Sequence, residues 1–249
     1  MNFNNPMILE ACVNSAMSAI EAQKGGADRV ELCENLHDGG TTPSAGAIRF
    51  TREKLHIGLF VMIRPRGGDF LYSQDEFRIM TEDIVIAKDS GADGVVFGIL
   101  NPDGTLDRER MRMLVELALP MQVTCHRAFD MTPDPFRAMD DLMELGIDRI
   151  LTSGQKPTAP EGADLIRKMI LKANGRIRIM PGSGVKEHNI VDLRNKTGAT
   201  EFHIHLEKQE PSRMVFRQTS VYMGNPGQSE FEHVLTDWKR IRKIRKLLE

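Results

Sequence analysis

The chain has 249 residues, of which 41% are hydrophobic and 27% are charged, a composition typical of a globular protein with a large core. The formal net charge of −2 argues against a nucleic-acid partner, and no apolar run approaches the roughly 18 residues that span a bilayer. Three cysteines in a chain without an export signal indicate free thiols in a reducing, cytoplasmic setting.

Eight short apolar or β-branched segments predict eight strands, and segments such as 15–24, 75–88 and 135–145 between them have helical periodicity. This alternation runs through residues 1–249 without a break in composition. It favours a single-domain α/β fold, the closed (β/α)8 TIM barrel, over an open doubly wound sheet. The strands are expected at 7–13, 29–33, 58–64, 94–100, 121–127, 149–153, 176–181 and 201–205.

One turn recurs before every second strand, in the stretches GGADRVELC, SGADGVVFG, LGIDRILTS and TGATEFHIH. In each stretch a glycine follows a helical segment, where glycine commonly ends a helix in the left-handed conformation. These glycines lie 65, 55 and 52 residues apart, which fits two βα units of about 30 residues in each interval. They are Gly26, Gly91, Gly146 and Gly198.

The end of the chain is less regular. Residues 206–228 are expected to form a long loop after strand eight, which acts either as a functional lid or merely as a cover. An amphipathic helix is expected at about 229–249. Its packing against the barrel is favoured over a membrane-surface role. The side of this helix that would pack is formed by Trp238, Ile241, Ile244 and Leu248.

The first two strands each carry a glutamate and a cysteine that share a face. Glu10 and Cys12, and likewise Glu31 and Cys33, should point into the barrel, because a carboxylate avoids the buried helix layer. The strands are neighbours, so the two thiols can approach each other and suit a soft cation such as Cu(I) or zinc. Alternatively they are small buried hydrophobic residues, the role expected of Cys125.

Several other strands also end in polar residues, and catalytic and binding groups of such barrels lie at these ends. Glu10, Glu31 and His126 are candidate acids or bases, because repulsion between adjacent carboxylates raises one pKa; Arg64 could instead pair with Glu31. Converging charges are costly to desolvate, which favours a functional pocket over a core network. The candidate substrate- or anion-binding residues are Arg64, Arg66, Arg127, Ser153, Gly182, Ser183, Gly184 and His203.

The stretch PGSGV, at 181–185, follows strand seven and is expected to open a helix. Backbone N–H groups at such a position can bind a phosphate or carboxylate, a common use of this corner of the barrel. The alternative is that its glycines serve a tight turn without a ligand.

Seven stretches along the chain resemble the CutC family, the copper homeostasis proteins. The resemblance implies a (β/α)8 barrel, cytoplasmic copper handling and Cu(I) held by Cys12 and Cys33. The chain departs from some relatives, which carry two adjacent cysteines on strand one, a phenylalanine at Cys125, and small residues after EFH. The matching stretches are GGADRVELC, GGTTPS (39–44), MIRPRGGDF (62–70), HRAFDM (126–131), RILTSGQ (149–155), PGSGV and GATEFH (198–203).

Three functions remain open at this level. The first is Cu(I) binding in copper homeostasis. The second function is that of an enzyme, because binding one copper ion does not need so many acids, arginines and histidines. This enzyme would be a lyase, isomerase or hydrolase that uses general acid/base chemistry on a small phosphorylated or carboxylated metabolite. The third is a non-catalytic barrel that acts through partner proteins. Copper or a small anion is the expected partner, without nucleic acid or membrane, and a homodimer or higher homo-oligomer is a further expectation.

Overall fold

The computed structural model describes residues 7–221, 223 and 229–249 of the chain. Helices alternate with the first eight strands in chain order. These strands are β1 Ile8–Val13, β2 Arg29–Leu32, β3 Gly58–Met62, β4 Gly94–Phe97, β5 Gln122–Cys125, β6 Arg149–Thr152, β7 Arg178–Pro181 and β8 Glu201–Ile204. The helices are α1 Ala16–Gly25, α2 Ala45–Lys54, α3 Gln74–Asp89, α4 Arg108–Ala118, α5 Pro135–Glu144, α6 Ala163–Ala173, α7 Ile190–Thr197 and α8 Trp238–Leu248.

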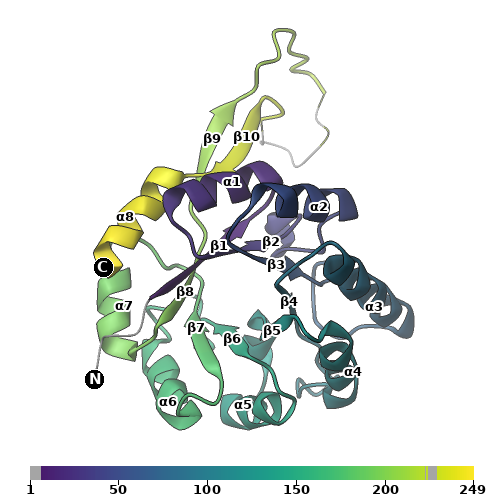
Figure 1. Ribbon diagram of the computed structural model, residues 1–249, viewed down its shortest axis with the longest axis vertical. Helices are drawn as coiled ribbons and strands as arrows, with labels where there is room; N and C mark the ends of the chain where they lie inside the picture. The colour runs from purple at the N-terminus through teal and green to yellow at the C-terminus, as the bar shows by residue number, and fades with distance from the viewer. Residues whose placement is uncertain (1–6, 222, 224–228) are drawn as a thin grey trace.

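The eight strands form one parallel sheet in the order β7-β6-β5-β4-β3-β2-β1-β8. Strand β7 also lies against β8, so the sheet curls into a nearly closed barrel surrounded by the helices (Figure 1). The predicted single-domain (β/α)8 barrel is confirmed. Most strands are one to three residues shorter than expected, because residues such as Arg64 and His126 leave the ladder and enter the loops above it.

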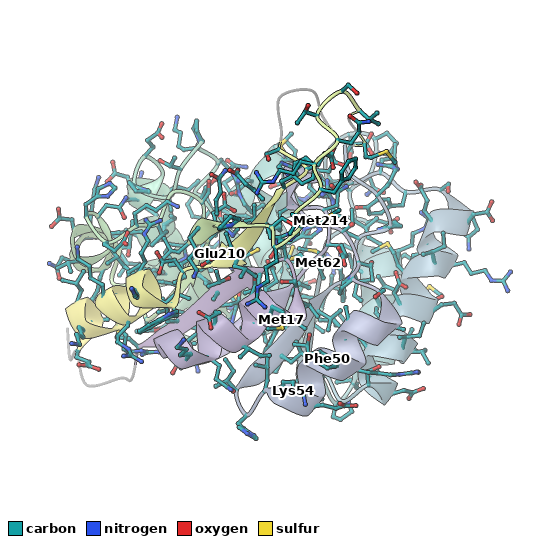
Figure 2. The ribbon with its side chains drawn as sticks, turned by 90° about the horizontal axis from the view of Figure 1, so that it is seen from above. Met17, Phe50, Lys54, Met62, Glu210 and Met214 are labelled. Carbon is teal, nitrogen blue, oxygen red and sulfur yellow. The ribbon has the colours of Figure 1, made fainter. Side chains whose placement is uncertain are left out.

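An arm of two antiparallel strands, β9 Glu207–Pro211 and β10 Glu232–Thr236, projects from the barrel between β8 and α8 (Figure 1). Figure 2 shows this arm from above, with Glu210 on β9 and Met214 just beyond it. The loop expected at 206–228 therefore contains strand β9. The sequence did not indicate this strand, because most of its residues are charged or polar. Residues 222 and 224–228 of that expected loop lie outside the described residues.

Helix α8 begins at Trp238 rather than near residue 229, because β10 occupies the preceding segment. Its residues Ile241, Ile244 and Leu248 are buried, and the helix packs against α1 as its apolar side predicts. Among the described residues, no helix combines the length and the apolarity that crossing a bilayer requires.

The recurring turn ends a helix, and in most copies it also holds the strand that precedes that helix. Its four glycines all adopt the left-handed conformation, with φ between 76° and 91°, as predicted. Two residues later in three of the turns, an aspartate side chain accepts a hydrogen bond from the backbone N–H of the preceding odd-numbered strand. The bonds run from Leu9 to Asp28 (2.6 Å), from Leu59 to Asp93 (2.8 Å) and from Val123 to Asp148 (2.8 Å).

Apolar side chains pack on both faces of the barrel wall. The large cluster fills the space between strands and helices and includes Cys125, which confirms the orientation expected for that thiol. A small second cluster contains Cys12, Cys33, Phe60, Met62 and Val96, all on the inward-facing positions of their strands. The two thiols of interest therefore lie inside the barrel.

The lower part of the barrel interior is filled by ions rather than by aliphatic layers. Arg29 binds Glu10 at 2.5 Å and Glu201 at 2.6 Å, and Arg149 also binds Glu201, at 2.5 Å. Both guanidinium groups lie about 5 Å from the Phe60 ring, at 5.2 and 5.3 Å. The ring fits because Gly94 faces it: a Cβ atom there would lie 2.3 Å from the ring. Two acids and two arginines thus form a neutral ion network.

Replacing Glu201 by glutamine should destabilise the fold by about 3–5 kcal/mol, because Arg149 would remain buried without a carboxylate partner. The free energy of unfolding in urea measures this. Asp164→Asn is the matched control, because Asp164 is 80% exposed in its pair with Lys196 and should contribute less than about 1 kcal/mol. Equal losses in the two variants would contradict the role assigned to the ion network.

Candidate functional site

A cavity of about 230 Å³ opens at the carboxyl ends of the strands, above the ion network. We call it the mouth cavity. An adjoining hollow of about 380 Å³ shares five lining residues with the mouth cavity and adds the turn after β7, which includes Ser183, Gly184 and Lys186. The mouth cavity is lined by Cys12, Glu31, Gly39, Met62, Arg64, Phe70, His126, Arg127, Leu151 and His203.

The two thiols from β1 and from the end of β2 meet at this cavity. Their sulfur atoms lie 4.0 Å apart, and Cys33 is also 3.5 Å from Glu31 Oε2. Cys12 is 8% exposed and Cys33 1% exposed, with Met62 and Val96 in the same apolar cluster. One thiol therefore reaches the cavity wall while the other lies behind it in a dry environment.

The contact between the two thiols shifts their pKa values in opposite directions. The hydrogen bond from Cys33 holds the pKa of Cys12 well below its usual range against the effect of burial, and contacts with His203 and His205 add to this. The same shared hydrogen bond, together with burial, raises the pKa of Cys33. Of the two thiols, Cys12 is therefore the more easily ionised.

His203 connects the ion network to the cavity. Its Nδ1 bonds Glu10 Oε1 at 2.7 Å, and its Nε2 lies 3.7 Å from Glu31 Oε2. Burial opposes its protonation, but the charge of Glu31 and the hydrogen bonds with Cys12 and Glu10 raise the pKa of His203 well above its usual range. The imidazolium therefore supplies a positive charge between the Glu10 carboxylate and the side chains of Glu31 and Cys12.

The two candidate acids have different environments. Burial opposes the ionisation of Glu10, but the Arg29 charge and the bond from His203 outweigh it and hold its pKa well below the usual range. Glu10 does not line the cavity. Burial raises the pKa of Glu31 well above its usual range, and the charges of Cys12 and Glu10 add to this. Of the two acids, Glu31 alone is placed at the cavity in a form that can donate a proton.

Arg64 follows β3 and lies on the cavity wall, 5% exposed. It does not pair with Glu31. Its guanidinium group instead donates to the carbonyl oxygens of Asp38, Gly40 and Gly68 at 2.6, 2.9 and 2.8 Å. The Phe70 ring covers it at 5.0 Å. Three carbonyl groups thus fix the direction of the side chain without neutralising its charge.

His126 caps the short helix η2, Arg127–Met131, by accepting the Ala128 N–H at its Nδ1, 3.2 Å away. The proton of the neutral ring is therefore on Nε2. Burial and the nearby Arg64 charge lower the pKa of His126 from 6.5 to about 3. The ring is neutral at ordinary pH, so it serves as a hydrogen-bond donor rather than as a strong base.

The remaining predicted anion-binding side chains serve mainly structural contacts. Arg66 does not line the cavity, because it binds Glu76 at 2.5 Å and Asp69 at 3.0 Å within its own loop. Arg127 lines the cavity but also binds Asp130 and Ser153, each at 2.8 Å. Ser153, which accepts the bond from Arg127, is buried and itself donates to Asp130 at 3.0 Å.

The PGSGV stretch forms a turn rather than a helix N-terminus, because α7 begins only at Ile190. Ser183 and Gly184 line the adjoining hollow, with φ of 72° and 70°. Gly182 packs closely under His203, since a Cβ at this position would lie 3.2 Å from the His203 Cβ. No helix dipole therefore points at the cavity from this corner, contrary to the expectation.

Phe70, Met62 and Leu151 are cavity residues that the sequence analysis did not select. Strand alternation would have identified two of them, because Met62 shares a face with Arg64, and Leu151 shares one with Ser153. Phe70 had no such signal, because it lies in the irregular loop between β3 and α3.

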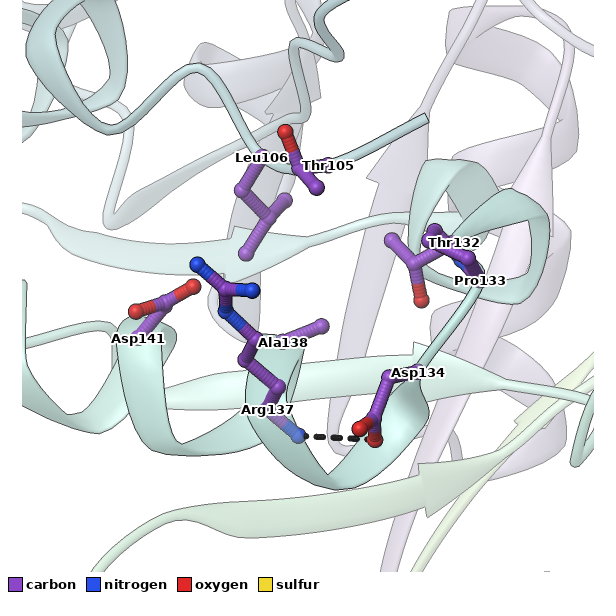
Figure 3. A pocket seen from close by; sticks show the side chains of 8 residues that line it. All are labelled: Thr105, Leu106, Thr132, Pro133, Asp134, Arg137, Ala138 and Asp141. Atoms are coloured by element: carbon purple, nitrogen blue, oxygen red, sulfur yellow. Dashed lines mark hydrogen bonds between the residues drawn. The ribbon is translucent and has the colours of Figure 1, made fainter. Parts of the chain in front are cut away.

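A separate cavity of about 90 Å³ lies on the side of the barrel, between the segment 105–106 and the start of α5 (Figure 3). Asp134 caps that helix through the N–H groups of Phe136 and Arg137, and the cavity shares no lining residue with the mouth cavity. It is therefore not part of the candidate site.

Replacing His126 by asparagine should flatten the pH dependence of stability. Between about pH 6.5 and about pH 3 the unfolded chain binds a proton at His126 and the folded chain does not, so the native protein loses stability as the pH falls through this window. Unfolding free energies of the native protein and of His126→Asn at several pH values measure the difference. Asparagine can keep the cap at Ala128. Parallel pH profiles would contradict the assignment.

Similar proteins identify the family. Residues 7–208 match the CutC family. The "Copper homeostasis protein cutC homolog" of Homo sapiens is 46% identical over 96% of this chain and 88% of its own length. A CutC family protein of Parabacteroides distasonis is 49% identical over 94% of this chain and 98% of its own length.

Solved structures agree. The CutC structure from Streptococcus agalactiae has 37% identity and a TM-score of 0.76, over 79% of this chain and 97% of its own. A phosphoribosylanthranilate isomerase from Thermotoga maritima shares the fold at 13% identity, with a TM-score of 0.56 over 97% of this chain and 98% of its own. The chain therefore belongs to the CutC family, and its relatives from Homo sapiens and Mus musculus are named copper homeostasis protein cutC homologs.

Proposed function

We propose that this protein binds Cu(I) as its cargo through the thiolates of Cys12 and Cys33. The observation that carries the proposal is the pair of sulfur atoms 4.0 Å apart, beside an open cavity. The copper homeostasis names of the relatives support it. The three cysteines are free, which fits the reducing, cytoplasmic setting expected from the sequence.

The residues present fit a soft ion. A thiolate–metal bond of about 2.3 Å, the length found for zinc, lets one ion bridge sulfur atoms up to about 4.6 Å apart. Glu31 lies close enough to both thiols to complete a group of three ligand atoms. The apolar surroundings of the thiols favour a soft, singly charged ion over a strongly hydrated one.

Anaerobic Cu(I) titration against a competing chelator tests the proposal. The native protein and Cys125→Ser should bind with the same affinity, because Cys125 faces the helices with a pKa raised by burial to about 12. Cys12→Ser/Cys33→Ser should bind at least a hundredfold more weakly, since it keeps neither sulfur ligand. If the double variant kept the native affinity, the thiols would not be the site.

A second candidate function is an enzyme that acts by acid/base chemistry on a small phosphorylated or carboxylated metabolite. The observation in its favour is that Glu31 Oε1, Arg64 Nε and His126 Nε2 are buried without hydrogen-bond partners, although their residues line the mouth cavity. Copper binding by two thiols gives no role to Arg64 or to His126. Glu31 is the proposed general acid, whereas Glu10 holds His203 in position.

Incubation of the metal-free protein with pooled small phosphorylated and carboxylated metabolites, followed by NMR, tests for turnover. Loss of one metabolite should slow by about 10²- to 10⁴-fold in Glu31→Gln, the usual contribution of a general acid or base. Cys125→Ser should keep the native rate. Consumption of no metabolite, or equal rates in native protein and Glu31→Gln, would remove this candidate.

A further inference from the structure

Three residues that line the mouth cavity each hold a buried polar atom without a hydrogen-bond partner, and two of these atoms are donors. Arg64 Nε and His126 Nε2 each belong to a side chain that is at most 5% exposed, and neither has a hydrogen-bond partner among the described residues. A buried donor without a partner costs its full desolvation penalty, so such atoms need a physical explanation. A ligand that accepts hydrogen bonds from both atoms would provide one.

The charge of Arg64 is also unbalanced. Among the described residues, no carboxylate oxygen lies within 4.0 Å of its guanidinium group, which contacts the three backbone carbonyls instead. Glu31 is directed to Cys33 and His203, not to Arg64. A buried cation normally has a counter-ion, so the charge of Arg64 favours an anion as the ligand at this position.

Phe70 joins the two donors into one subsite. Its ring lies 4.9 Å from the His126 ring and 5.0 Å from the Arg64 guanidinium carbon. His126 is the neutral tautomer that donates at Nε2, because the Ala128 N–H occupies Nδ1. A fixed cation and a fixed neutral donor beside one aromatic ring suit an oxyanion attached to an apolar group.

We propose that Arg64 and His126 bind the carboxylate or phosphate group of a small organic anion, whose apolar part lies against Met62, Phe70 and Leu151. A cavity of about 230 Å³ is below the usual range for drug-sized ligands, about 300–1,000 Å³, which limits the anion to a compact compound. The inference rests on the second candidate function and assigns the residues that would bind the charged group and the apolar part of its substrate in the same cavity. It does not depend on copper.

Calorimetric titration of the metal-free protein with four probes tests the subsite: inorganic phosphate, propanoate, benzoate and the neutral propanamide. At least one anion should bind, and propanamide should bind at least tenfold more weakly than propanoate if the carboxylate is the preferred group. Preference for phosphate or for a carboxylate identifies the ligand group. The proposal would be overturned if none of the three anions bound. It would also be overturned if propanoate and propanamide bound more tightly than the other probes and with equal affinity.

Variants assign the binding to the two side chains. His126→Asn keeps the cap at Ala128 but does not reach the position of Nε2, and it should weaken the preferred anion about ten- to hundredfold. Arg64→Lys should weaken it similarly, because lysine keeps the charge without the guanidinium geometry. Arg66→Lys, in the same loop but away from the cavity, should bind like the native protein.

Histidine NMR adds a readout that a loss of stability would not mimic. The His126 Nε2 proton should shift when the anion is added to native protein, and this signal should be absent in His126→Asn. Anion binding without turnover of any metabolite would remove the second candidate function and leave the subsite standing. Native affinity in both His126→Asn and Arg64→Lys would overturn the subsite itself.

Discussion

The structure depends on how the barrel interior neutralises its buried charges. Arg29 and Arg149 share Glu201, and Arg29 also binds Glu10, so the lower interior is close to neutral around the Phe60 ring. Charges in such a dry space persist only when they are paired and hydrogen-bonded. The network thereby fixes Glu10, and Glu10 in turn fixes His203 directly beneath the cavity.

The cavity above the network has two chemically different parts. On one side are the two thiols with Glu31 and His203, and the distances that join His203 to Glu10 and Glu31 and the two sulfur atoms to each other are 2.7 to 4.0 Å. On the other side are Arg64 and His126 beside Phe70, and the Nε of Arg64 and the Nε2 of His126 have no acceptor among the described residues. The first part suits a soft metal ion and proton exchange, and the second suits an oxyanion. One fold can supply both because every strand ends at the same rim.

Much of the fold was predictable from local patterns. The four left-handed glycines, the period of two βα units and the inward face shared by Glu10, Cys12, Glu31 and Cys33 all follow from residue type and alternation. The arm was not predictable, because β9 and β10 stabilise each other across about 20 intervening residues and carry little apolar pattern of their own.

The sequence by itself determined which residues face inward and that they gather at one end of a barrel, since both follow from the strand period and from parallel connections. Only the tertiary structure decided what each residue there does. Arg66 and Arg64 lie two residues apart in one motif, yet one is neutralised by Glu76 and the other faces the cavity without a counter-ion. Pairing of charges depends on distances between segments far apart in the chain, and local sequence does not encode those distances.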